Sequence, residues 1–119
     1  MAYIYKNPKL ISSPKGKVEV IEVLYDGADD PAYSLALIKW EGQTKLGIRW
    51  NIAEAEWDDA KKQNGQAECI GNPQSRGHST WFVLPDDSVF YNIIKEASDK
   101  IYSKIWVYLE WIIPFIFNL

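Results

Sequence analysis

Three short runs rich in β-branched residues, separated by turn signals, constrain the fold of this chain most strongly. The runs are VEVIEVLY at 18–25, SLALIKW at 34–40 and KLGIRWN at 45–51. β-Branched and aromatic residues favour strands, and the second and third runs are separated by only a few turn residues that begin Glu41-Gly42. We therefore predict a sheet in which these two runs form a hairpin.

The second half of the chain predicts one more strand and then a helix. TWFVL at 80–84 follows the turn-forming stretch 71–79, and PDDS at 85–88 offers side chains that cap a helix. Beyond it, apolar residues recur at three- and four-residue spacing, as on the face of a helix that packs on a sheet. They are Val89, Phe90, Ile93, Ile94, Ala97, Ile101 and Ile105. The predicted fold class is α+β, a four-stranded curved antiparallel β-sheet followed by a C-terminal amphipathic helix.

We predict that the sheet and the helix form a single domain at residues 18–104. Further segments lie before the sheet and between its strands. Residues 1–17 mix Pro, Ser and Gly with four lysines, which is typical of an extended arm or a poorly ordered leader that could still touch a polyanion. The stretch 52–66, IAEAEWDDAKKQNGQ, indicates a short surface helix or a long acidic loop.

The tail at 105–119 is apolar almost all round. As a helix it would span about 22 Å, less than a hydrocarbon core of ~30 Å, and Pro114 interrupts it. We expect no transmembrane segment here. An apolar surface of this size predicts a homodimer or a higher homo-oligomer formed by the helix and its tail, and the lack of a basic face makes membrane attachment the less favoured alternative.

Composition limits the function classes. Thirteen Lys and Arg against sixteen Asp and Glu give a net charge of −3, so nucleic-acid binding would need a local basic patch. Cys69 is the single cysteine, and no basic-then-apolar leader is present. We therefore expect a cytoplasmic protein.

Alternation along the third run assigns its two faces. Leu46, Ile48 and Trp50 share one side, whereas Lys45, Gly47, Arg49 and Asn51 share the other. The apolar side is predicted to face the core, which favours a buried Trp50 over an exposed stacking platform. Arg49 is then predicted to point outward, either to a ligand or to a solvated ion pair.

The order of four strands and a helix, with the pattern formed by Trp40, Gly42, Ile48, Arg49 and Trp50, resembles the PC4-like family of single-stranded DNA-binding domains. The resemblance covers roughly the middle two-thirds of the chain. It implies a curved sheet that meets single-stranded nucleic acid and a helix that pairs two subunits. The stretch GIRWN with NPQSRGHSTWFVLP also resembles small uncharacterised bacterial or phage proteins, which imply no activity.

Carried over by position, the resemblance implies that Lys39, Lys45 and Arg49 contact phosphates and that Trp40, Trp50 or Trp81 stack on bases. The chain departs from the family by its acidity, by the added segment 52–79 and by its apolar tail.

The segment QSRGHST at 74–80 is the preferred local site, because Arg76, His78 and their hydroxyl neighbours suit a phosphate or a base edge. The alternative is a loop closed by its own turns, with Arg76 anchored to a carboxylate or a carbonyl. Because nucleophile elbow, metal-ligand spacing and phosphate-binding glycine loop are all missing from the sequence, we expect no enzyme, no metal and no cofactor.

Two functions follow as hypotheses. The first is a homo-oligomeric protein that binds single-stranded nucleic acid on a basic sheet face formed by strands two and three. The alternative is a protein-binding module, such as a phage or mobile-element inhibitor or an immunity-like protein, which would turn its aromatic surface and the acidic run Glu54 to Asp59 toward a basic target. Clustering of Lys39, Lys45, Arg49 and Arg76 would favour nucleic acid, and dispersion would favour a protein. A small-ligand pocket under the loop at 70–80 is a third possibility.

Overall fold

The computed structural model describes residues 3–28 and 32–117, with side chains described as far as residue 103. The chain forms two compact units, Met1–Pro85 and Asp86–Leu119. The first holds all the strands and is called the sheet unit here. The second is a helix, and each unit is described by itself.

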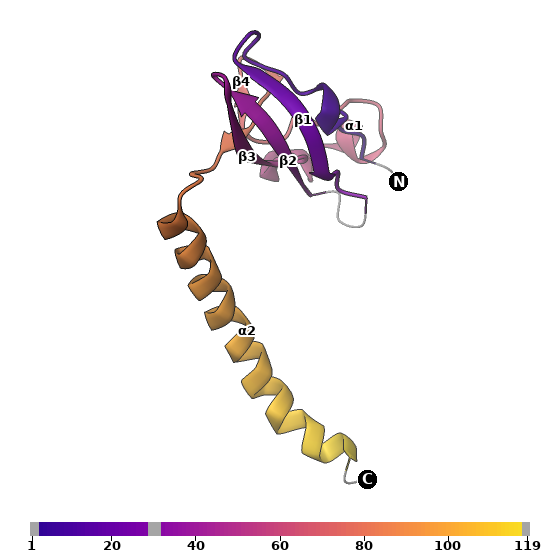
Figure 1. Cartoon of the computed structure of the whole chain (residues 1–119). Helices are drawn as coiled ribbons and strands as arrows, with labels where there is room; N and C mark the ends of the chain where they lie inside the picture. The colour runs from indigo at the N-terminus through magenta and orange to yellow at the C-terminus, as the bar shows by residue number, and fades with distance from the viewer. Residues whose placement is uncertain (1–2, 29–31, 118–119) are drawn as a thin grey trace. The chain divides into compact units, whose positions relative to one another are not determined.

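The sheet has four antiparallel strands in the order β1-β2-β3-β6 (Figure 1). Their bounds are β1 Val18–Tyr25, β2 Tyr33–Trp40, β3 Gln43–Trp50 and β6 Phe82–Val83. Two register shifts in β1, after Val20 and after Val23, interrupt its pairing with β2, and such irregularities bend and twist a strand. The predicted fold class, an α+β chain with a four-stranded antiparallel sheet before a C-terminal helix, is confirmed.

Short elements fill the remaining parts of the sheet unit. They are the 3₁₀ helices η1 (Pro8–Leu10) and η2 (Glu54–Glu56), the helix α1 (Ala60–Gln63) and the hairpin of β4 (Gln74–Ser75) with β5 (His78–Ser79). The short surface helix predicted within 52–66 is confirmed. The β4–β5 hairpin was predicted only as turns, because strands of two residues carry no periodicity to recognise.

The core lies on one face of the sheet and includes the N-terminal segment. Ile11, Val18, Ala36, Ile38 and Trp81 form one buried cluster. The indole Nε1 of Trp81 donates to the Ile11 carbonyl at 2.9 Å. The extended arm predicted for 1–17 is therefore wrong for residues 3–17, because Ile11 in this segment is buried in the core.

The predicted faces of β3 are inverted. Gly47 and Arg49 lie on the core side, where Arg49 is 1% exposed, whereas Trp50 is 50% exposed. A β-carbon on Gly47 would lie 3.1 Å from side-chain atoms of both Ile38 and Trp81, so the glycine lets the core approach the strand. The alternation of residues along β3 correctly assigned them to two faces of the sheet. It could not show which of the two faces is covered by the segments 3–17 and 51–81.

The helix α2 spans Ser88–Phe117. The side chain of Asp87 accepts the Phe90 amide at 2.8 Å, which confirms the predicted acidic cap. The break expected at Pro114 is wrong, since the helix continues to Phe117. The side chains of the predicted oligomerisation tail, 105–119, lie outside the described residues. In the part of the chain that was described, no helix is long and apolar enough to span a membrane.

Candidate nucleic-acid interface

Arg49 is a structural side chain. Its guanidinium Nη1 donates to the carbonyls of Thr80 and, at 3.4 Å, Pro73, and its Nη2 donates to the carbonyl of Ile70. Burial lowers the pKa of Arg49 to about 10, against the opposing effect of the Glu56 carboxylate, so the group remains charged at neutral pH. The prediction that Arg49 points outward to a phosphate is wrong, because its donors are aimed at loop carbonyls inside the unit.

Glu56 holds the same loop from the other side. Its carboxylate accepts the amides of Ala53, Ile70 and Gly71 at 2.8–2.9 Å and the Lys62 ammonium at 2.7 Å. Burial acts to raise the pKa of Glu56, but these hydrogen bonds outweigh it and lower the pKa to about 2. Arg49 and Glu56 together fix the segment that leads from α1 to the β4–β5 hairpin.

The tryptophans proposed for stacking have different environments. Trp81 is 6% exposed in the core and has its indole nitrogen bonded, so it offers no face to a base. Trp40 is half-buried against the same core. Trp50 is the exposed one, contrary to the expectation that it is buried.

Lys39 and Lys45 do not share a face. Lys45 lies opposite the buried Ile38 in the β2–β3 register, on the core side of the sheet, and is half-buried. Lys39 follows Ile38 in β2 and therefore points to the other side, where it is exposed. With Arg49 buried as well, strands two and three do not form the predicted basic face. Lys39, Lys45, Arg49 and Arg76 are therefore dispersed, which is the arrangement expected for the protein-binding alternative.

Basic residues instead gather around the N-terminal segment, in two clefts. One, of about 430 Å³, is lined by Lys6, Ser12, Ser13, Lys15 and His78. The other, of about 450 Å³, is lined by Gly16, Lys17, Val18, Glu19, Lys39 and Gly42. Lys15, Gly16 and Lys17 are consecutive, so the clefts lie on either side of one short stretch of chain. We call Lys6, Lys15, Lys17, Lys39 and His78 the basic strip.

A turn positions the central part of this strip. The amides of Lys17 and Val18 both donate to the Pro14 carbonyl, at 3.1 and 3.3 Å, and Gly16 has φ +81°, which a residue with a side chain adopts at a cost. The first strand begins directly after it. Lys15 and Lys17 are thereby exposed on a turn that directly precedes the first residue of β1.

The segment 74–80 contains both buried and exposed side chains. Ser79 is buried and its hydroxyl donates to the Ile70 carbonyl at 2.7 Å. Arg76 and His78 are exposed. Arg76 has φ +53° at the tip of the hairpin, where the Gly77 amide donates to the Gln74 side chain at 3.1 Å. His78 reaches the first basic cleft.

Of the predicted site residues, the structure therefore brings only Lys39 and His78 into basic clefts, with Arg76 two residues from His78. Sequence reasoning noted that the four lysines of residues 1–17 could touch a polyanion, but it did not name Lys6, Lys15 or Lys17 as site residues. The available signal was that residues 1–17 contain four lysines and no Asp or Glu. Within the described residues, no group of three or more His, Cys, Asp or Glu side chains could hold a metal ion.

Comparison of the chain with protein-family models, with curated proteins and with solved structures found no match.

Proposed function

We propose that this protein is a non-enzymatic nucleic-acid-binding protein that holds the phosphates of a single strand along the basic strip. The observation that carries the proposal is the pair of neighbouring clefts around Lys15 and Lys17. Their titratable lining residues are four lysines, one histidine and a single carboxylate, Glu19. A chain of net charge −3 gathers this local excess of positive charge on one stretch of surface.

The contacts available there suit phosphate. Lysine ammonium groups and the hydroxyls of Ser12 and Ser13 donate hydrogen bonds and read no base sequence. A single strand can bend from one cleft to the next around the turn at Gly16, whereas a stiff duplex bends over that range only at a cost in free energy. The strip therefore favours a flexible polyanion, bound without sequence preference.

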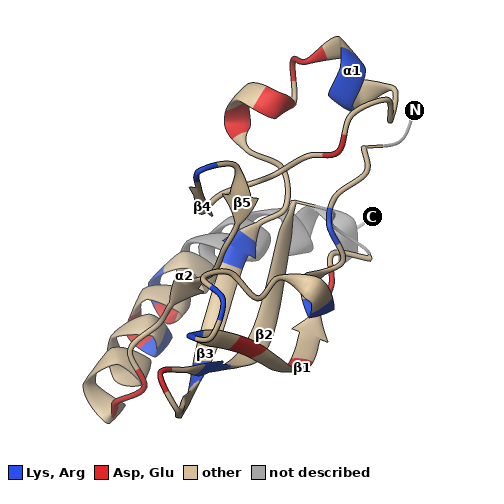
Figure 2. Cartoon of the chain, turned by 90° about the horizontal axis from the view of Figure 1, so that it is seen from above, with Lys and Arg blue, Asp and Glu red and all other residues tan. Residues whose placement is uncertain are grey.

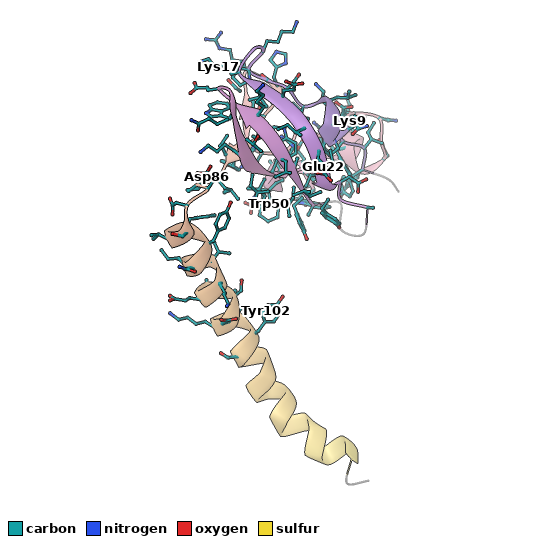
Figure 3. All side chains as sticks on the ribbon, in the orientation of Figure 1. Lys9, Lys17, Glu22, Trp50, Asp86 and Tyr102 are labelled. Atoms are coloured by element: carbon teal, nitrogen blue, oxygen red, sulfur yellow. The ribbon has the colours of Figure 1, made fainter. Side chains whose placement is uncertain are left out.

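Stacking contributes little to this binding. The exposed Trp50 lies at the opposite end of the sheet from Lys17, as Figure 3 shows and as the strand register requires. Electrostatic attraction must then supply most of the affinity. With four phosphate contacts, counterion release predicts that affinity for single strands falls about 50-fold between about 50 mM and 200 mM salt.

The test is fluorescence anisotropy of a labelled poly-dT strand with the full-length protein. Lys15→Glu with Lys17→Glu should weaken binding at least about tenfold. Lys61→Glu with Lys95→Glu is the matched control, since it makes the same change of charge at two residues that line neither basic cleft, and should weaken binding less than about threefold. A lack of binding at low salt, or an equal loss with the control, would refute the proposal. Equal affinity for duplex DNA would refute the preference for single strands.

Self-association through α2 is also proposed, on a separate observation. Val89, Ile93, Ile94 and Ile101 lie at helical spacing and are 49–65% exposed. Light scattering should find a dimer or larger assembly, and Ile93→Glu with Ile101→Glu should reduce it to monomer, because buried carboxylates oppose an apolar interface. Asn92→Glu, on the polar side of the helix, should leave the assembly intact. A monomeric wild type, or a double variant that stays assembled, would contradict this role of the stripe.

A further inference from the structure

A third cleft, at the other end of the sheet from Lys17, has a different chemistry. It measures about 320 Å³ and is lined by Trp50, Ile52, Ala53, Glu54, Trp57 and Asn72. Trp50 and Trp57 are 50% and 36% exposed. Large aromatic side chains that remain in contact with water at one hollow are typical of a recognition site.

Each indole packs against a tyrosine ring. Tyr33 packs with an interplanar angle of 74° against Trp50, with ring centroids 6.3 Å apart. Tyr3 packs at 72° against Trp57, with centroids 4.8 Å apart, and its hydroxyl donates to the Trp57 carbonyl at 2.9 Å. These edge contacts orient the rings before any ligand arrives.

The backbone around the cleft is hydrogen-bonded as well. Trp50 and Asn72 exchange both of their backbone hydrogen bonds, at 2.7 and 2.8 Å. The Ala53 amide donates to the Glu56 carboxylate, which also holds the opposite loop. The cleft is therefore built from segments that the fold already fixes for its own stability.

The charge at this cleft is negative. Glu54 lines it and is exposed, and Asp58 and Asp59 follow in the same segment, where Figure 2 shows the acidic residues gathered before α1. The Glu56 carboxylate is already bonded to Lys62 and to the amides of Ala53, Ile70 and Gly71. A carboxylate beside indole faces attracts cations, because the negative face of an aromatic ring adds to the charge. The same carboxylates repel the phosphates that a stacked nucleobase would bring.

We propose that the cleft between Trp50 and Trp57 binds an organic cation, a guanidinium or alkylated ammonium group, through cation–π contact with the indoles and an ion pair with Glu54. Such a group can arrive as an arginine or lysine side chain of a basic protein or as a free small molecule. The chemistry of recognition is the same for both. This site is independent of the basic strip and of its proposed ligand.

The experiment is a ¹H–¹⁵N NMR titration of the full-length protein, in which each of the six tryptophans has its own indole N–H signal. Trp50→Phe and Trp57→Phe assign the two signals. Choline and an arginine-containing tripeptide are the cations, and 3,3-dimethylbutan-1-ol and the citrulline tripeptide are their uncharged counterparts. The signals of Trp50 and Trp57 should shift with both cations, and the uncharged counterparts should bind at least about tenfold more weakly.

Glu54→Gln should weaken cation binding several-fold, and Asp99→Asn on α2 is the matched control that should not. Tighter binding of the arginine peptide would identify a protein partner, and tighter binding of choline would identify a small molecule. Equal binding of the uncharged counterparts would overturn the proposal. So would a lack of shifts up to about 20 mM cation, or shifts of these two signals by poly-dT alone.

Discussion

Arg49 and Glu56 hold opposite sides of the same residue. The guanidinium of Arg49 donates to the carbonyl of Ile70, and the carboxylate of Glu56 accepts the amide of Ile70 at 2.8 Å. Ile70 connects the acidic segment around α1 to the hairpin that carries Arg76 and His78. The cleft at Trp50 and Trp57 and the basic cleft that His78 lines therefore both adjoin segments that these two charged groups hold.

Replacement of Arg49 should destabilise the sheet unit and not simply weaken a surface contact. Arg49→Ala would remove the guanidinium from the Thr80 carbonyl and leave the Ile70 carbonyl with only the Ser79 hydroxyl, and we expect a loss of about 3–5 kcal/mol in the free energy of unfolding, measured in urea. Lys39→Ala, at an exposed site, should change it by less than about 0.5 kcal/mol. Equal, small effects of the two substitutions would show that Arg49 is not structural.

Stability should fall in acid because of Glu56. Its pKa is lowered from 4.5 to about 2 in the folded protein, so its contribution is complete above pH 4.5 and is lost as pH falls toward 2. That difference corresponds to at most about 3 kcal/mol. Urea unfolding between pH 5 and pH 2 should show this loss in the wild type, and Glu56→Gln should show a flatter dependence. An unchanged slope in Glu56→Gln would assign the acid sensitivity to other carboxylates.

Substitution of Gly42 and of Gly71 by alanine distinguishes the cost of an unfavourable φ from the cost of steric overlap. Gly42 and Gly71 both have positive φ, +84° and +74°. A β-carbon at Gly42 meets nothing within 4 Å, whereas one at Gly71 would overlap the Trp50 carbonyl and the Arg49 guanidinium and lie 2.7 Å from the Asn51 carbonyl.

Gly42→Ala should therefore cost about 1–2 kcal/mol, and Gly71→Ala at least about 2 kcal/mol more. Thermal unfolding followed by circular dichroism measures both. Similar costs at the two positions would mean that the loop at Gly71 relaxes, and would argue against a closely packed contact between Arg49 and this loop.

Cys69 should react slowly in the native protein. It is 1% exposed, and burial followed by the nearby Glu56 carboxylate raises the pKa of its thiol, so both access and the thiolate fraction are reduced. We expect its reaction with a disulfide reagent such as dithionitrobenzoate to be at least about 100-fold slower than in urea. Cys69→Ser provides the blank. A native rate close to the unfolded one would show that the bridge between Tyr5 and Cys69 does not hold the N-terminal segment in place.

Local sequence patterns were enough to predict the first three strands and the start of α2. The run VEVIEVLY gave β1 its observed bounds, and Asp87 was recognisable as a cap because acidic and hydroxyl side chains satisfy the first helical amides. The bounds of β2 and β3 were predicted within two residues. These features depend on neighbours in the chain, which the sequence displays directly.

The candidate sites could not be predicted in the same way, since they depend on which face of the sheet is covered. β2 carries apolar residues on both sides, Leu35 and Leu37 on one and Ala36 and Ile38 on the other, so alternation alone cannot choose between them. Ile11 and Trp81, 70 residues apart, cover the second side, and this places Arg49 inside and Trp50 outside.

The sequence by itself determined the order of strands and helix, the capping of α2 and the local excess of lysine in residues 1–17. Only the tertiary structure decided that Lys6, Lys15 and Lys17 line two clefts with His78 and Lys39, and that Trp50 and Trp57 share a cleft with Glu54. The physical reason is that propensity and periodicity act over a few residues, whereas burial is set by contacts between segments that are distant in the chain.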